Sequence, residues 1–119
     1  MPFILAIDDD PEYLKDFSMA LEGKANFKAF TGPCDFELNV NKDDIEQANL
    51  IIVDYHFNIG TSIDCDIAAY IRKQLGFKGK IILCSSCLDF KRDSENVKVA
   101  FDGIIPKETF NWESVHHHL

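Results

Sequence analysis

The chain has 119 residues, enough for one domain with a single hydrophobic core. Its hydrophobic content of 46%, with ten Phe, argues against disorder, and its net charge of −8 argues against direct binding to nucleic acid, which needs a basic face. No apolar run approaches the roughly 18 residues of a membrane span, and the N-terminus lacks the basic start and long apolar stretch of a signal peptide. We therefore expect a cytoplasmic protein with no membrane contact.

The first 33 residues predict a strand, a helix and a second strand. The apolar run Phe3–Ile7 is typical of a buried strand. Asp10 can cap a helix that has Pro11 at its first position, and Gly23 is a suitable end. Asn26–Phe30 predicts the second strand, which ends before a turn at residues 31–33. The apolar face of the helix comprises Leu14, Phe17 and Leu21.

The middle of the chain is less regular. Between Cys34 and Ala48 we expect a short or irregular helix and then a helical turn at Asp43–Gln47. Asn49–Val53 is apolar throughout, as in a parallel strand covered on both faces. Thr61 and Asp64 can form the capping box of a further helix. The core face of that helix would comprise Ile63, Ile67, Ile71 and Leu75.

The last 40 residues predict two more strands, at Lys80–Cys84 and Gly103–Pro106. A weakly periodic stretch at 88–100 and a short segment at 108–117 are expected to be helical. Strands and helices that alternate at this spacing predict right-handed βαβ units and a parallel sheet with helices on both faces.

Charged and polar residues follow the predicted strands. Three acids, Asp8, Asp9 and Asp10, follow the first strand, Asp54 follows the third, Ser85 the fourth and Lys107 the fifth. The carboxyl ends of parallel strands share one edge, so these side chains can converge there. Oxygen ligands favour a hard cation such as Mg²⁺. With the cation bound, one carboxylate can attack a phosphoryl group as an oxygen nucleophile.

Single residues of this set also have purely structural interpretations. Asp10 is expected to serve as the helix cap, and Lys107 taken alone would be a solvated surface lysine. His56 is more typical of a loop residue than of a side-chain ligand. Asp54 stands alone in the middle of the set and is the best candidate nucleophile.

Four segments together resemble the receiver domain of response regulators in two-component systems: FILAIDDDPEYL, LIIVDYHF, KIILCSS and DGIIPK. The resemblance covers nearly all of residues 1–119 as one receiver-like domain. It implies a flavodoxin-like (βα)5 fold, a doubly wound parallel sheet of five strands in the order 2-1-3-4-5.

The resemblance also implies a role for each site residue. Asp54 would accept a phosphoryl group from a histidine kinase or a phosphotransfer protein. Mg²⁺ would be held by Asp8, Asp9, Asp54 and the backbone carbonyl of His56, with Asp9 more direct than Asp8. Ser85 would be the switch hydroxyl, and Lys107 would contact the phosphoryl group. Such a domain is not an enzyme beyond its own phosphorylation and dephosphorylation.

The chain departs from the family pattern at four places. Tyr55-His56-Phe57-Asn58 stands where a Met-Pro pair is usual, and Ile104 replaces the common aromatic switch residue. Pro106 precedes the lysine instead of following it, and only twelve residues come after Lys107, so the last helix is short or cut. These departures affect how phosphorylation is read out, and leave the set of acids, Ser85 and Lys107 intact.

Phe101, Ile104, Phe110 and Trp112 have two interpretations. They complete the core, or some of them lie on the face around the family's fourth helix, fifth strand and fifth helix, through which receivers form homodimers or bind partners. The four cysteines are expected to be reduced, and Cys84-Ser85-Ser86-Cys87 lacks a second pair for zinc. The run His116-His117-His118 is compatible with a metal-binding sequence or a purification tag and supports no functional assignment.

Two other functions stay open. A pseudo-receiver would bind a partner without phosphorylation, and the altered loop after Asp54 motivates it. A small hydrolase would use Asp54 as a covalent nucleophile. His56 is the only candidate general acid next to it in the sequence, and the sequence has no substrate-capping insert.

Overall fold

A parallel sheet forms the centre of the computed structural model, which describes residues 1–8, 10–54, 63–85 and 101–119. Its five strands lie in the order β2-β1-β3-β4-β5, and every neighbouring pair is parallel. This order confirms the flavodoxin-like topology expected from the sequence. The strands are β1 (Phe3–Ile7), β2 (Asn26–Phe30), β3 (Leu50–Asp54), β4 (Lys80–Ser85) and β5 (Gly103–Pro106).

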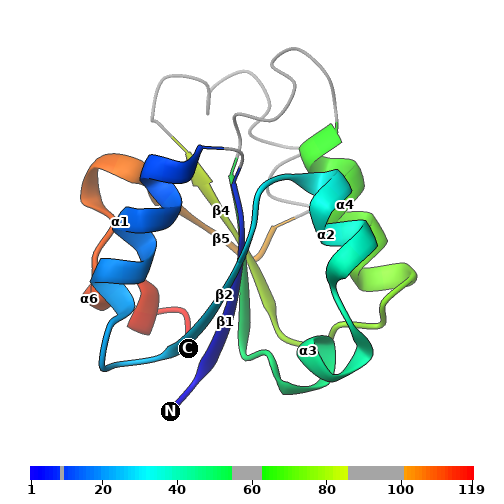
Figure 1. The fold of residues 1–119 in the computed structure, drawn as a ribbon, viewed down its shortest axis with the longest axis horizontal. Coiled ribbons are helices and arrows are strands. Elements are labelled where there is room, and N and C mark those ends of the chain that lie inside the picture. Colours follow the sequence, from blue (N-terminus) through cyan, green and yellow to red (C-terminus); the bar gives the residue numbers. More distant parts are fainter. Residues whose placement is uncertain (9, 55–62, 86–100) are drawn as a thin grey trace.

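Helices cover both faces of the sheet, which gives three layers (Figure 1). On one face lie α1 (Pro11–Leu21) and α6 (Trp112–His116). On the other face lie α2 (Pro33–Asn39), α3 (Lys42–Gln47) and α4 (Ile63–Lys73). None of the helices in these described segments is long and apolar enough to cross a membrane.

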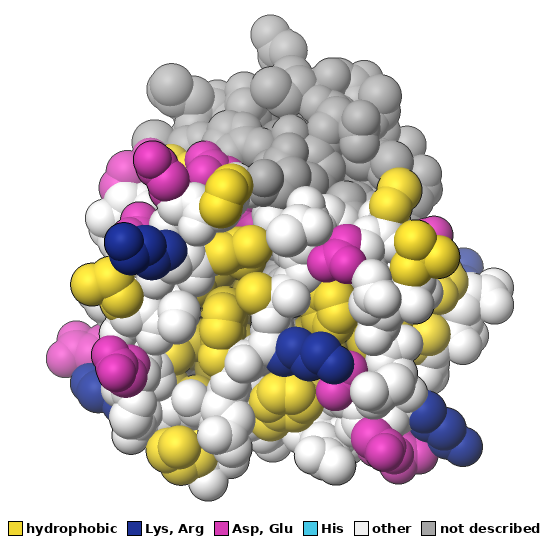
Figure 2. Space-filling model, in the orientation of Figure 1, with side chains coloured by type: hydrophobic (Ala, Val, Ile, Leu, Met, Phe, Trp, Pro, Cys, Tyr) yellow, Lys and Arg dark blue, Asp and Glu magenta, His cyan; other side chains and the backbone are white. Residues whose placement is uncertain are grey.

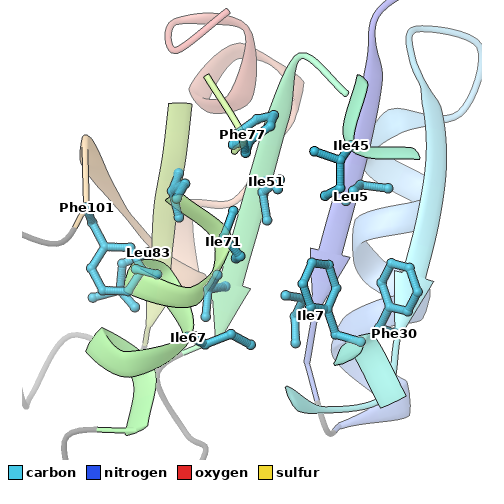
Figure 3. Close-up of a cluster of buried hydrophobic side chains, with 14 residues drawn as sticks. Leu5, Ile7, Phe30, Ile45, Ile51, Ile67, Ile71, Phe77, Leu83 and Phe101 are labelled. Carbon is cyan, nitrogen blue, oxygen red and sulfur yellow. The ribbon is translucent and has the colours of Figure 1, made fainter. Parts of the chain in front are cut away.

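Two apolar cores explain why the strands are hydrophobic on both faces. Alternate residues of a strand point to opposite sides, so Leu5 and Ile7 of β1 join one core while Ile4 and Ala6 join the other. The core under α2, α3 and α4 is shown in Figure 3, where Phe30 and Ile7 lie close to one another. Burial on both sides confirms the interpretation of the uniformly apolar strands.

Helix α1 begins where the sequence predicts. The side chain of Asp10 accepts a hydrogen bond of 2.9 Å from the backbone N–H of Glu12, and Pro11 occupies the first helical position. Past the other end, Gly23 has a φ of 74°, a left-handed conformation that glycine adopts without strain.

The segment between β2 and β3 has the helical structure that the sequence predicts. It contains a short helix, α2, and then α3, which begins at Lys42, just before the helical turn expected at Asp43–Gln47. Asn41 caps α3: its side chain accepts from the N–H of Asp44, whose carboxylate accepts from the N–H of Asn41 in return. Asp44 takes the place of the Glu or Gln that is usual in such a capping pair.

The prediction of one helix at 108–117 is wrong. A short 3₁₀ turn, η2 (Lys107–Thr109), precedes α6, which starts only at Trp112. Asn111 lies between them with extended backbone, and its side chain caps α6 by accepting from the N–H of Ser114 at 2.9 Å. A residue in that conformation cannot continue a helix, so the cap divides the segment. The helix expected at 88–100 and Thr61 of the predicted capping box lie outside the described residues.

Arg72 joins the last turn of α4 to the starts of two strands. Its guanidinium donates to the carbonyl of Phe77 at 2.9 Å and to that of Gly79, and it pairs with the carboxylate of Asp102. Asp102 also accepts from the N–H of Ile81 at 2.8 Å. The planar, many-donor guanidinium therefore links α4, β4 and the residue before β5.

Candidate functional site

The strand register brings the predicted site positions to one edge of the sheet. Ile7 is paired with Val53, so Asp8 and Asp54 are the next positions on neighbouring strands. Asp54 is itself paired with Cys84, and Ser85 with Pro106, the residue before Lys107. The backbone thus places Asp8, Asp54, Ser85 and Lys107 at the carboxyl ends of β1, β3, β4 and β5, the upper edge in Figure 1.

A buried ion pair lies at this edge. The ammonium Nζ of Lys107 is 3.2 Å from Oδ2 of Asp8. The Lys107 side chain is 2% exposed and the Asp8 side chain 0%. This burial excludes the interpretation of Lys107 as a solvated surface lysine. Charges removed from water interact strongly and tolerate poorly the loss of a partner, so the two side chains hold each other in place.

Asp8 also shapes the loop between β1 and α1. Its backbone N–H donates to the carbonyl of Phe30 at 3.0 Å, which extends the β1–β2 ladder by one bond. Its Oδ1 accepts a hydrogen bond of 2.9 Å from the N–H of Asp10, the residue that caps α1. One carboxylate therefore contacts Lys107 with one oxygen and fixes the start of α1 with the other.

Tyr13 contacts Lys107 at this site, and the sequence did not predict that contact. Its ring centroid lies 3.6 Å from Nζ of Lys107, a short cation–π contact. Tyr13 sits in the first turn of α1, and side chains of a helix lean toward its N-terminus, here toward the edge with the acids. A tyrosine three residues past a capping aspartate was the available signal, but many surface helices carry one.

Several predicted ligands are not tested. Asp9 and His56 lie outside the described residues, and for Asp54 only the backbone is described. Within the described part, no three His, Cys, Asp or Glu side chains are grouped so as to hold a metal ion. The described member of the set, the buried carboxylate of Asp8, has the oxygen chemistry that suits Mg²⁺.

Acidic side chains near the site favour cations. Figure 2 shows Asp and Glu side chains gathered at the upper end of α1, next to the sheet edge. Glu12 lies in the first turn of this helix, and Asp10 caps it. A concentration of negative charge raises the local concentration of cations and repels an anion that arrives alone.

The four residues considered for an interaction face do not form one patch. Phe101 is 5% exposed and is part of the core under α4, which places it in the interior and not on a contact surface. Ile104 packs partly buried against the same core. Phe110 and Trp112 pack against the other core, under α1 and α6. There the ring centroids of Phe110 and Phe17 are 4.3 Å apart. The core interpretation therefore accounts for Phe101.

A surface pocket lies at the opposite edge of the sheet. It has a volume of about 630 Å³ and lies between α3 and the loop after α4, with Ile45, Leu75, Phe77 and Lys78 among its lining residues. No predicted site residue is among the described residues that line it. The pocket and the acidic edge are thus separate features.

Solved structures show that this arrangement is a known fold. A response regulator receiver protein from Pseudoalteromonas atlantica is 19% identical and superimposes with a TM-score of 0.76 over 97% of this chain and 92% of its own. The response regulator TrrA from Thermotoga maritima, crystallised in complex with Mg²⁺ and BeF, is 21% identical with a TM-score of 0.72, covering 98% and 95% of the two chains.

The chemotaxis protein CheY4 from Vibrio cholerae gives a TM-score of 0.75 at 15% identity, covering 100% of this chain and 99% of the other. No protein-family model and no curated protein sequence matches the chain. At such low identity the likeness concerns the backbone, and the side-chain chemistry rests on the contacts described above.

Proposed function

We propose that this chain accepts a phosphoryl group on Asp54 with the help of Mg²⁺. The proposal starts from the fold, which is that of response regulator receiver domains. The observation that carries this proposal is the buried pair of Asp8 and Lys107 at the sheet edge where β3 ends in Asp54. A lysine ammonium kept out of water just after β5 would contact a phosphoryl oxygen at the end of β3, which lies two strands away at the same edge of the sheet.

Each residue of the set would have its own task. Asp8, Asp9, Asp54 and the backbone carbonyl of His56 would hold Mg²⁺, which would supply charge neutralisation at the phosphoryl oxygens. The Asp54 carboxylate oxygen would form the new P–O bond while the bond between phosphorus and the donor nitrogen breaks. The donor histidine keeps the electron pair of that bond, and Lys107 and the hydroxyl of Ser85 would each contact a phosphoryl oxygen.

The donor would be a phosphohistidine of a histidine kinase or phosphotransfer protein, which would bind this chain in the cytoplasm. The output would be a shift between two conformations of the surface. A homodimer through the face around β5 is part of this proposal. Of the residues considered for it, Ile104 packs against one core, and Phe110 and Trp112 pack against the other.

The direct test is phosphorylation by a small donor. With Mg²⁺ and acetyl phosphate we expect intact-mass spectrometry to show one phosphoryl adduct, and Asp54→Asn to abolish it. Beryllofluoride with Mg²⁺ should bind the wild-type chain and not this variant. An exposed acid far from the edge, Asp43→Asn in α3, serves as the matched control and should keep the adduct.

The other functions give different results. A chain that binds neither Mg²⁺ nor beryllofluoride contradicts the proposal and favours a pseudo-receiver. Steady turnover of a generic phosphate ester that requires Asp54 would favour a hydrolase.

A further inference from the structure

We propose that Tyr13 is a positioning residue for Lys107: its ring holds the ammonium group at the sheet edge, where a phosphoryl oxygen would be bound. The inference rests on the proposed phosphoacceptor function. Its basis is the contact of 3.6 Å between Nζ of Lys107 and the ring centroid of Tyr13, next to the 3.2 Å contact between the same nitrogen and Asp8.

The position of the ring is fixed by the loop before it. The carboxylate of Asp8 accepts from the N–H of Asp10, and the carboxylate of Asp10 accepts from the N–H of Glu12. These two hydrogen bonds set the first turn of α1. Tyr13 follows directly in that turn and is half-buried. The same carboxylate that pairs with Lys107 therefore also determines where the ring lies.

The ring and the carboxylate attract the ammonium in different ways. The attraction of Asp8 falls when a divalent cation neutralises the acids, because the net negative charge near the ammonium decreases. The attraction of the ring comes from its quadrupole and does not depend on the charge of the acids. Tyr13 would thus keep Lys107 in position in the cation-loaded state, when the lysine is needed at a phosphoryl oxygen.

The removal of the ring tests this role. We expect Tyr13→Leu to lower the rate of adduct formation with acetyl phosphate and Mg²⁺ about tenfold, because the ammonium is less well placed. Tyr13→Phe keeps the aromatic face and should stay within about twofold of the wild-type rate. The matched control is Tyr70→Leu, a half-buried tyrosine of α4 that packs on the other side of the sheet.

A double-mutant cycle separates positioning from a general structural effect. In a Lys107→Ala background, Tyr13→Leu should have no further effect on the rate, because the ammonium on which the ring acts is gone. If Tyr13→Leu slows both backgrounds by the same factor, the ring acts independently of Lys107 and the proposal is overturned.

A second cycle measures the ring–ammonium contact without phosphoryl chemistry. In Mg²⁺-free buffer, the unfolding equilibrium constants of wild type, Tyr13→Leu, Lys107→Met and the double variant should show a coupling of about fivefold or more. A wild-type chain that forms no adduct but shows this coupling contradicts the phosphoacceptor function alone. A normal adduct with no coupling in either cycle contradicts the role of Tyr13 alone.

Discussion

At the scale of single residues, the central feature is a lysine taken almost entirely out of water. Lys107 lies between the carboxylate of Asp8 and the ring of Tyr13. A carboxylate and an ammonium that are both desolvated contribute less as a pair than their attraction suggests, but the loss of one leaves the other buried and uncompensated. The stability of the chain should therefore depend on the match between the two.

We expect Lys107→Met to lower the free energy of unfolding by about 3 kcal/mol in Mg²⁺-free buffer, because Asp8 loses its ammonium. Adding Asp8→Asn should restore most of this loss, since the amide oxygen can still accept from the N–H of Asp10. Urea denaturation of the single and double variants measures both effects.

The matched control for this change is Lys28→Met. Lys28 also pairs with an aspartate, Asp44, but its side chain is 39% exposed, so its loss should cost less than about 1 kcal/mol. If Lys107→Met unfolded at the same urea concentration as Lys28→Met, the burial of the Asp8–Lys107 pair would not have the energetic role described.

The residues of this edge were predictable to different degrees. The placement of Asp8, Asp54, Ser85 and Lys107 at one edge could be predicted because each follows an apolar run, and parallel strands share an edge. The pairing of Lys107 with Asp8 could not be predicted, since nothing in the sequence shows which carboxylate an ammonium will contact. Tyr13 was missed for the same reason: its contact joins residues 94 positions apart, and no local pattern marks it.

At the scale of elements, the C-terminal segment packs closely on the edge strand β5. A Cβ atom at Gly103 would lie 2.6 Å from Cε1 of His118 and 3.1 Å from Cδ1 of Ile82. Gly103 is the first residue of β5, and its lack of a side chain lets the residues after α6 approach the strand. The close approach, and not a special backbone angle, explains this glycine.

We expect Gly103→Ala to destabilise the chain by about 1 to 3 kcal/mol through this overpacking. His118→Ala in the same chain should remove most of the loss, because the ring that the new methyl group meets is gone. Thermal unfolding of the two single variants and the double variant gives the coupling. Additive losses would show that the two residues are not in contact.

Elements with strong local signals were predicted well, and the last helix, which starts at a cap that the sequence did not single out, was not. The strands and α1 follow from apolar runs and from the Asp10-Pro11 start, which act within a few residues. The helix expected at 108–117 was wrong because the cap at Asn111 divides it. The histidine run, which supported no assignment, turns out to include a residue that packs on β5.

At the scale of the whole molecule, stability should fall on mild acidification. Burial lowers the pKa of His118 below its ordinary value of 6.5, and the neighbouring charges of His117 and Lys80 lower it further. The folded chain therefore binds a proton at this group less readily than the unfolded chain. Below about pH 6.5 the unfolded state takes up the proton first, so stability decreases as the pH falls.

We expect the free energy of unfolding to decrease between pH 7.5 and pH 5.5, and His118→Gln to reduce that decrease. Urea titrations at several pH values measure it. An unchanged slope in His118→Gln would exclude this histidine as its source. A separate loss is expected only near and below pH 3.8, since the backbone N–H of Thr31 lowers the pKa of Asp35 in the folded state.

The contact between Asp8 and Lys107 joins residues separated by 99 positions. Their strands are not neighbours, since β3 and β4 lie between β1 and β5. Closing so long a loop is entropically costly, so we expect the contact to form after the intervening strands have docked. A contact that forms late in folding slows unfolding more than it accelerates folding. A chain still short of its last strand would hold the buried acid of β1 without its lysine, so the complete charge arrangement exists only in the finished fold.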